Sequence, residues 1–188
     1  TFPWGSPVPV QVVGVTGATQ LATGGASACA LIAGGSVKCW GLGDDGALGD
    51  GSNNSSNVPV DVVGISGATQ ISGSGRSFCA LVPGGTIKCW GYNGSGNLGD
   101  GTAVNSNVPV DVIGISGAIQ VEATVSGTCA LFADGTAKCW GDNHYGQLGD
   151  GTTINRLLPV AVNTAPGSAL YGKTVVALSA GFYHSLAL

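Results

Sequence analysis

The sequence contains no methionine, and only 9% of its 188 residues are charged. Its six lysines and arginines are scattered along a chain of net charge −4, so no basic cluster predicts binding to nucleic acid by neutralisation of phosphates. No apolar run is long enough to span a membrane. These absences exclude nucleic acid as the expected partner and membrane insertion as the expected mode of attachment.

Residue patterns that carry catalysis or bind cofactors are equally scarce. Of the two histidines, His144 falls in an expected loop and His184 near the end of the chain, and neither belongs to a nucleophile or metal motif. No glycine-rich phosphate loop lies between a strand and a helix, and no helix of useful length is expected. The loops 41–46 and 141–146 have the Asp, Asn and Gly content of calcium loops, but turns formed by Asn and Asp explain them as well. The sequence predicts no enzyme, no metal and no cofactor.

Glycine, by contrast, is abundant. Its 34 residues and a mean hydropathy of +0.34 indicate a globular, β-rich chain and not a disordered or collagen-like one. The stretch CALVPGGTIKCWG from Cys79 to Gly91 returns, with substitutions, from Cys29 to Gly41 and from Cys129 to Gly141, each time in the same register. Two short apolar runs joined by a three-residue turn that ends in glycine predict a β-hairpin in each copy.

The turn also fixes the expected pairing within each hairpin. If the loop is centred on Gly84, Val82 lies opposite Thr86 and Cys79 lies opposite Cys89. Cysteines at such a non-hydrogen-bonded pair have Cα atoms roughly 4.5 Å apart, which a disulfide can span. Reduced, buried cysteines are the alternative, whereas the spacing lacks the CxxC grouping of zinc sites. We expect one disulfide per hairpin: Cys29 with Cys39, Cys79 with Cys89 and Cys129 with Cys139.

The cysteine pairs bear on the compartment. Disulfides persist in oxidising environments, so an extracellular or cell-surface protein is expected. The chain starts Thr1-Phe-Pro-Trp without an initiator methionine or a signal peptide, and we therefore expect a processed or excerpted chain. Acceptor patterns for N-glycosylation begin at Asn53, Asn54 and Asn93, and they apply only if the source glycosylates secreted proteins.

Two further strands are expected in each period of 50 residues. The first is rich in β-branched residues and contains a proline, whose missing N–H confines it to an edge, so we expect it to be the outermost strand. Its copies are Val8–Val13, Val58–Val63, Val108–Ile113 and Leu158–Val162. The second is short and made of small residues, with copies at Ala18–Ala22, Ala68–Ser72 and Ala118–Glu122.

Four-stranded units at this period are typical of β-propellers, so we predict an all-β, propeller-type array of four-stranded blades. Residues 1–188 are expected to form a single array, with repeats at about 8–57, 58–107 and 108–157 and a partial fourth repeat at 158–188. One blade cannot bury both of its faces, so neighbouring blades are expected to cover leucines on one face and tryptophans on the other. These predicted core residues are Leu31, Leu81, Leu131, Trp40, Trp90 and Trp140.

A Gly-Asp-Gly triplet also recurs in register, at residues 49–51, 99–101 and 149–151. A catalytic carboxylate would seldom be needed three times. We therefore expect Asp50, Asp100 and Asp150 to cap their loops by accepting hydrogen bonds from loop amides.

The combination of Cys-Ala-Leu, Gly-x-x-Lys-Cys-Trp-Gly and Gly-x-Leu-Gly-Asp-Gly resembles the repeat of the regulator of chromosome condensation family over almost the whole chain. The resemblance implies a seven-bladed propeller. Members of that family include an exchange factor for a nuclear GTPase and a secreted bacterial inhibitor of β-lactamases. His184 occupies the family's histidine position, and Leu186 takes the first cysteine slot of the fourth repeat; the other repeats replace the histidine with Ser27, Ser77 and Gly127.

The fourth repeat carries extra residues around Asn163 to Lys173 and stops after three expected strands, which leaves an open end. Further residues of a longer chain, a second copy or head-to-tail contacts in a filament are expected to cover it, with 8–13 of one copy continuing the blade begun by 184–188 of another. The sequence predicts a non-enzymatic, extracellular module with a structural or protein-binding role. The alternative is a regulator of an enzyme, either exchange-factor-like or β-lactamase-inhibitor-like.

Overall fold

The structure is a computed structural model that describes residues 11–125, 127–181 and 185–188. The described residues form three four-stranded antiparallel sheets and one two-stranded hairpin, consistent with the predicted all-β class. The first sheet contains β1 (Ala18–Thr23), β2 (Ser27–Ile32), β3 (Val37–Gly41) and β4 (Ser56–Asp61). The second contains β5 (Gln70–Ser74), β6 (Ser77–Val82), β7 (Thr86–Gly91) and β8 (Ser106–Asp111). The third contains β9 (Ala118–Ala123), β10 (Gly127–Phe132), β11 (Ala137–Gly141) and β12 (Arg156–Ala161), and the hairpin contains β13 (Leu178–Ala180) and β14 (Ser185–Ala187).

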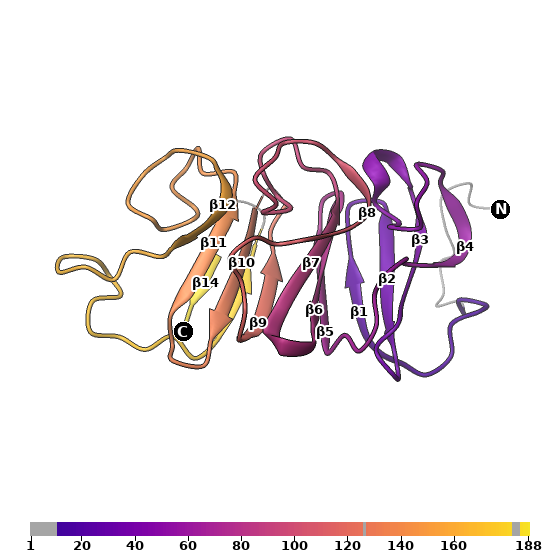
Figure 1. Cartoon of the computed structure of the whole chain (residues 1–188), viewed down its shortest axis with the longest axis horizontal. Coiled ribbons are helices and arrows are strands. Elements are labelled where there is room, and N and C mark those ends of the chain that lie inside the picture. The colour runs from indigo at the N-terminus through magenta and orange to yellow at the C-terminus, as the bar shows by residue number, and fades with distance from the viewer. Residues whose placement is uncertain (1–10, 126, 182–184) are drawn as a thin grey trace.

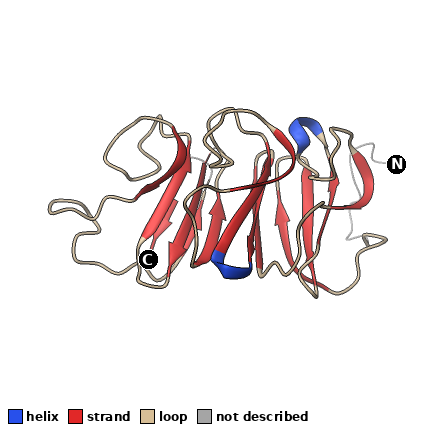
Figure 2. Ribbon diagram, viewed as in Figure 1, coloured by secondary structure: helices blue, strands red, loops and turns tan. Residues whose placement is uncertain are grey.

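The sheets, which we call blades 1 to 3, stand side by side in chain order along the longest axis of the molecule, and the C-terminal hairpin lies beside blade 3 (Figure 1). Within each blade the strands follow one another in chain order. The proline-containing strands β4, β8 and β12 are therefore the outermost, as predicted. Loops occupy most of the rest of the chain (Figure 2). The helical segments of the described residues are two three-residue 3-10 turns, η1 (Asp44–Gly46) and η2 (Pro83–Gly85), and no described helix is long and apolar enough to cross a membrane.

The predicted hairpin register is confirmed. In blade 2, Val82 pairs with Thr86 and Cys79 pairs with Cys89. Gly84 takes φ +81° in the turn, a conformation that side chains disfavour, which is why glycine is needed there. The three predicted disulfides join the central strands of their blades at Cα–Cα distances of 4.0 to 4.1 Å: Cys29–Cys39, Cys79–Cys89 and Cys129–Cys139.

The blades begin and end at other residues than the predicted repeats, which were counted from Val8. Each proline-containing strand pairs with the hairpin that precedes it in the chain, as Val60 of β4 does with Cys39. Of the predicted first strand, residues 8–10 lie outside the described part of the chain, and residues 11–13 are not in a strand. The first blade begins only at Ala18. The strand counted as opening each repeat thus closes a blade.

The core lies between the blades in three layers. Each blade contributes its disulfide and a leucine to the face that meets the next blade, and its tryptophan position to the face that meets the preceding one. The leucines at the predicted positions, Leu31, Leu81 and Leu131, are buried, as are Trp90 and Trp140. Trp40 differs from the prediction because it is only half-buried, and its face of blade 1 has no preceding blade among the described residues.

Candidate functional site

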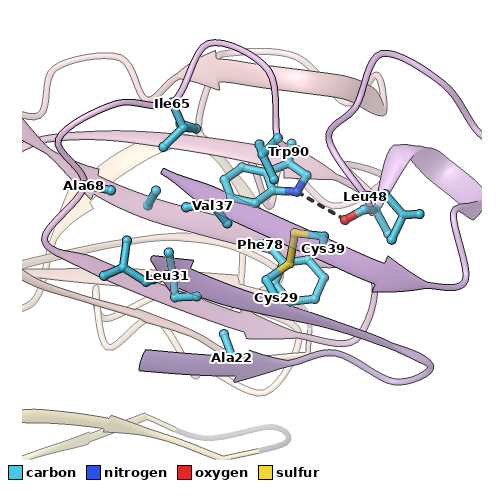
Figure 3. Packing of buried hydrophobic residues seen from close by; sticks show 14 of the residues in the cluster. Ala22, Cys29, Leu31, Val37, Cys39, Leu48, Ile65, Ala68, Phe78 and Trp90 are labelled. Carbon is cyan, nitrogen blue, oxygen red and sulfur yellow. Dashed lines mark hydrogen bonds between the residues drawn. A yellow bond between two sulfur atoms is a disulfide. The ribbon is translucent and has the colours of Figure 1, made fainter. Parts of the chain in front are cut away.

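Each buried tryptophan fills a socket made by the blade before it. Trp90 extends from β7 toward blade 1 and donates its indole N–H to the carbonyl of Ala47 at 3.1 Å, as Figure 3 shows. The socket floor is Gly49, where an added Cβ would lie 2.8 Å from Trp90 Cδ1, so only glycine leaves room for the ring. Val62 supplies the apolar wall beside it. The ring of Phe78 stacks on Trp90 with centroids 6.1 Å apart.

The second socket repeats the first, one blade further on. Trp140 donates its indole N–H to the carbonyl of Asn97 at 2.9 Å. An added Cβ at Gly99 would lie 2.8 Å from Trp140 Nε1 and 2.9 Å from Val112. Glycine floor, valine wall and backbone carbonyl thus form a repeated acceptor for an indole ring.

Glutamines join the blades at their inner strands. The side-chain amide of Gln20 in β1 donates to the carbonyl of Ile71 at 2.9 Å and accepts from the N–H of the same residue at 2.8 Å. Gln70 makes the same pair of bonds to Val121 in blade 3. The side chain therefore acts as an extra backbone unit, which satisfies the otherwise unpaired edge of the next inner strand.

The last glutamine of this series joins blade 3 to the hairpin: Gln120 pairs with both backbone groups of Leu178. These glutamines were not among the predicted site residues, although their 50-residue spacing was visible in the sequence. Ala177 occupies the next position in the series, immediately before Leu178, so the hairpin offers no such amide to a following blade.

The loops after β7 and β11 are organised by buried asparagines that the sequence interpretation also missed. Asn93 is fully buried and accepts from the N–H of Leu98 at 2.9 Å. Its amide donates to Asp100 Oδ1 at 3.1 Å and to the carbonyls of Thr102 and Val104 at 3.2 and 3.0 Å. Asn143 makes the equivalent set of bonds in blade 3. This burial makes Asn93 inaccessible as a glycan acceptor in the folded chain.

The three repeated aspartates accept hydrogen bonds from amides two residues further on. The acceptors are Asp50, Asp100 and Asp150, and the donors are the N–H groups of Ser52, Thr102 and Thr152, at 2.8 to 2.9 Å. The loops that they shape then reach the next blade. Gly51 donates to the carbonyl of Asn107 at 2.9 Å, and Gly101 donates to the carbonyl of Leu157 at 3.0 Å. The outer strands are thereby joined in the same direction as the inner ones.

The pKa of Asp150 is strongly perturbed. Burial by itself would raise its pKa, but hydrogen bonds from Thr152, Arg156 and Asn143 outweigh burial and lower the pKa to about 2. The guanidinium of Arg156 contacts Asp150 Oδ2 through Nη2 at 2.6 Å and Nε at 2.8 Å. The charged form of Asp150 is therefore favoured by the folded state.

This lowered pKa predicts how stability depends on pH. The folded pKa lies below the ordinary value of 3.8, so the stabilisation by Asp150 is present above about pH 4 and is lost as the pH falls towards 2. We expect Asp150→Asn to lower the free energy of unfolding by about 1–2 kcal/mol at pH 7 and by much less near pH 2. Urea unfolding of both proteins at several pH values measures the difference. A difference that does not change between pH 7 and pH 2 would contradict the assignment.

A polar cleft of about 500 Å³ lies between the loops of blades 1 and 2. Asp45 crosses it, with Oδ2 2.9 Å from Arg76 Nη1 and Oδ1 accepting from the amide of Asn105 at 2.8 Å. Asp45 has φ +60°, in the left-handed region, and the ion pair and the amide hold it there. The charges of Asp45 and Arg76 are thus engaged with each other.

The histidine of the described residues, His144, lies in an exposed loop. Its Nδ1 contacts Asp142 Oδ1, and Gln147 donates to Asp142 Oδ2 at 3.0 Å. Burial would raise the pKa of Asp142, but the bonds from His144 and Gln147 outweigh it and lower the pKa. Among the described residues no group of three metal-ligating acidic, histidine or cysteine side chains is present. His184 lies outside the described residues, so its predicted position remains a prediction.

The first blade presents its preceding face without a neighbouring blade among the described residues. Leu21 is 66% exposed, whereas its equivalents Ile71 and Val121 are 1% and 0% exposed. Trp40 is half-buried, and its indole N–H has no hydrogen-bond partner among the described residues. This face therefore carries the apolar side chains of a blade interface in a more exposed state.

Comparison with known proteins identifies the repeat. The sequence matches the regulator of chromosome condensation (RCC1) repeat over residues 34–82, 85–131 and 134–188, with a second match to this repeat at 118–147. The chain belongs to the RCC1 repeat family. The predicted family and the propeller-type fold are thus confirmed. No curated protein sequence matches this RCC1-repeat chain significantly.

Solved structures share the fold of the chain at low sequence identity. Prp20p from Saccharomyces cerevisiae superposes with a TM-score of 0.79 at 16% identity, over 93% of this chain and 44% of its own. Human WBSCR16 gives 0.63 at 19% identity, over 91% and 57%. The ectodomain of the Physcomitrella patens receptor kinase CR4 gives 0.55 at 23% identity, over 90% and 38%. The RCC1-repeat chain spans about half the length of the solved chains that it matches.

Proposed function

We propose that this RCC1-repeat chain is a non-enzymatic, extracellular module with a structural or protein-binding role, and that its open faces join it to other copies or to the rest of a larger propeller. The observation that carries the proposal is the exposed face of blade 1. Leu21 and Trp40 occupy positions whose equivalents in blades 2 and 3 are buried against the preceding blade. In repeat arrays each unit packs only against its neighbours. An exposed apolar surface at such a position is therefore typical of an interaction face.

The three disulfides support the extracellular part of the proposal, because such bonds persist in oxidising compartments. The structural relatives support protein binding in a general sense. Prp20p has binding properties toward Gsp1p and histones, and a second solved structure contains Kap60 bound to yeast RCC1. Those partners belong to the relatives, and surface loops, which vary among propellers, determine partner choice.

Light scattering across a dilution series tests the role of the open face. We expect the 18.3 kDa chain to associate in a concentration-dependent manner. Leu21→Asp should weaken that association at least tenfold, because it places a charge in an apolar contact. Val104→Asp, which changes an equally exposed aliphatic residue of a loop, is the matched control and should have little effect. If the unchanged chain and Leu21→Asp both stay monomeric as the concentration rises, self-association is contradicted. Insertion into a longer chain would then be the remaining role of the open face.

The alternative function is regulation of an enzyme, either as an exchange factor or as an inhibitor of the β-lactamase-inhibitor type. The polar cleft beside Asp45 and Arg76 and the exposed loop around Tyr145 give the loop face the polar and aromatic groups of a protein-binding surface. A stoichiometric complex with a single enzyme, formed in a pull-down from the native source, would favour this alternative. Recovery of further copies or flanking repeats alone would favour the structural role.

A further inference from the structure

The polar cleft beside Asp45 adjoins a second, smaller pocket. This pocket has a volume of about 220 Å³, and Asp44 and Arg76 line both it and the cleft. Asp44 and Asp45 belong to η1 of blade 1, which contacts β8 of blade 2 (Figure 1). The remaining residues around the pocket are small or apolar: Gly25, Ala26, Ser27, Leu42, Ala47 and Gly75. A polar cleft and a mainly apolar pocket therefore share one wall at the junction of blades 1 and 2.

The internal repeat separates what the fold requires at this junction from what it does not. Residues that shape the loops recur every 50 residues, as the aspartates of the three Gly-Asp-Gly triplets do. The positions equivalent to Asp45 instead hold serine and tyrosine, and those equivalent to Arg76 hold alanine and serine. The ion pair that crosses the cleft is therefore not part of the repeated framework, and the fold does not account for it.

Small residues at two positions keep the apolar pocket open. Ala47 is the smallest member of its series, which continues with Asn97 and Gln147, and Gly75 is followed by Val125. The side chain of Asn97 is completely buried at the junction of blades 2 and 3. Because Ala47 lines the pocket, we expect a side chain of that size at position 47 to extend into it.

The cleft carries polar groups that are available to a ligand. Asp45 is paired with Arg76, whereas the carboxylate of Asp44 is exposed and accepts no hydrogen bond from the described residues. The amide of Asn53 is likewise exposed and makes no bond within the described chain. Arg76 contacts Asp45 through Nη1, which leaves further N–H groups of the guanidinium for other acceptors. The cleft therefore offers hydrogen-bond donors and acceptors together.

This combination fits a neutral ligand with several hydroxyl groups. A hydroxyl both donates and accepts, so it can bond to a carboxylate, an amide and a guanidinium alike. An anion would be repelled by Asp44 and Asp45, and a cation would be repelled by Arg76. The adjoining pocket suits a small apolar substituent, because burial of apolar surface favours binding. The cleft volume of about 500 Å³ is in the range of small-molecule sites.

We propose that the junction of blades 1 and 2 is a binding site for an N-acetylated sugar. The ring hydroxyls lie in the cleft, where Asp44 accepts and Asn53 and Arg76 donate, and the methyl of the acetamido group enters the pocket beside Ala47. Such a sugar is neutral and combines several hydroxyls with one small apolar group. The inference goes beyond the proposed function, since Leu21 of the exposed face does not line the site.

Sugar titrations of the intact chain test the site. We expect the methyl glycoside of N-acetylglucosamine or of N-acetylgalactosamine to bind with a dissociation constant on the order of 1 mM, typical of a small polar ligand. Binding should shift the amide NMR signals of Asp44, Ala47 and Gly75. Methyl glucoside and methyl galactoside, which lack the acetamido group, should bind at least tenfold more weakly. Equal binding with and without that group, or no shift with either acetylated sugar at about 20 mM, would overturn the proposal.

Two variants locate the binding. Ala47→Asn introduces the residue of the equivalent position in blade 2, and it should weaken binding at least tenfold because it fills the pocket. Arg76→Ser removes the guanidinium donors and should weaken binding by a similar factor. Lys38→Ser, which breaks the exposed ion pair of Lys38 with Asp61 outside the site, is the matched control and should leave binding unchanged. Full sugar affinity in both folded site variants would place the sugar elsewhere and overturn the site.

Two further measurements separate this proposal from its neighbours. If n-butylammonium, the side chain of lysine, shifts the same signals at lower concentration than either acetylated sugar, the cleft recognises a basic side chain of a partner protein and the sugar proposal is wrong. Leu21→Asp should bind the sugar as the unchanged chain does, and a loss of sugar binding in this folded variant would contradict the site. Sugar binding by a chain that stays monomeric would uphold the site and refute self-association, so the two proposals fail separately.

Discussion

Replacing Trp90 with alanine is expected to lower the free energy of unfolding by about 3–5 kcal/mol, the range for deletion of a large buried aromatic side chain. The ring is completely buried between blades 1 and 2, where it stacks on Phe78 and donates to Ala47. Its removal leaves a cavity that the disulfide-linked strands on either side cannot collapse to fill, and it leaves the carbonyl of Ala47 without its donor. Urea unfolding followed by circular dichroism measures the loss.

Trp40→Ala is the matched control, because it makes the same change at the same position of the repeat. Trp40 is half-buried, and its N–H has no described partner, so we expect less than half of the Trp90→Ala effect. Equal losses for the two variants would show that the tryptophan face of blade 1 is covered in solution as deeply as the interior faces. That outcome would contradict the open end on which the interaction proposal depends.

The hairpins could be predicted because their determinants are local. A glycine at the third turn position and two cysteines at symmetric distances from it leave one register, and Cys79 pairs with Cys89 accordingly. The proline of the outer strand also determines its place, since Pro59 cannot donate to a further strand. Chemistry confined to about a dozen residues was sufficient for both conclusions.

The positions at which each blade begins and ends could not be predicted from the repeat alone. A repeating sequence has no intrinsic beginning, and the proline-containing strand could pair with the hairpin before it or with the strand after it. The long loop after each tryptophan determines which pairing forms, because it folds back across the end of its own blade. Asn93 and Asp100 hold that fold through their mutual hydrogen bond, so the information lies in buried polar contacts and not in strand propensity.

The glutamine series shows a signal that was present but not interpretable. Gln20, Gln70 and Gln120 stand 50 residues apart, yet each bonds to backbone groups of the next blade. Backbone groups carry no sequence signature, so these partners become visible only when the blades are stacked. The same holds for Trp40, whose pattern matches the buried tryptophans and whose exposure depends on what precedes its blade.

Asn93→Ala is expected to lower the free energy of unfolding by about 2–4 kcal/mol, although the residue matches a glycosylation pattern that is usually found on surfaces. The amide side chain is fully buried and bonds to Leu98, Asp100, Thr102 and Val104. Alanine fits sterically but leaves the buried N–H of Leu98 without a partner, which costs about 1–3 kcal/mol, and it also removes the bonds to the carbonyls of Thr102 and Val104.

The first repeat shows what this asparagine contributes. Its equivalent is Gly43, which has no side-chain amide and whose N–H donates to Ser55 Oγ at 3.1 Å. A Cβ at Gly43 would lie 2.0 Å from the carbonyl oxygen of Asn54, so the loop of blade 1 follows a path that excludes a side chain. The loop of blade 2 follows a different path, in which the carbonyls at 102 and 104 point at the Asn93 amide. We therefore expect loss of the amide to destabilise the conformation that this loop adopts.

Asn53→Ala is the control for this experiment, since Asn53 is exposed and its change should stay within about 0.5 kcal/mol. Urea unfolding of both variants gives the free energies, and amide hydrogen exchange at Leu98 reports the loop directly. We expect the Leu98 amide to lose protection in Asn93→Ala, because its acceptor is the Asn93 side chain at 2.9 Å. The opposite result would be retained protection at Leu98 and a fall in the free energy of unfolding no larger than that of Asn53→Ala. It would show that water replaces the Asn93 amide and that the buried network does not determine the course of the loop.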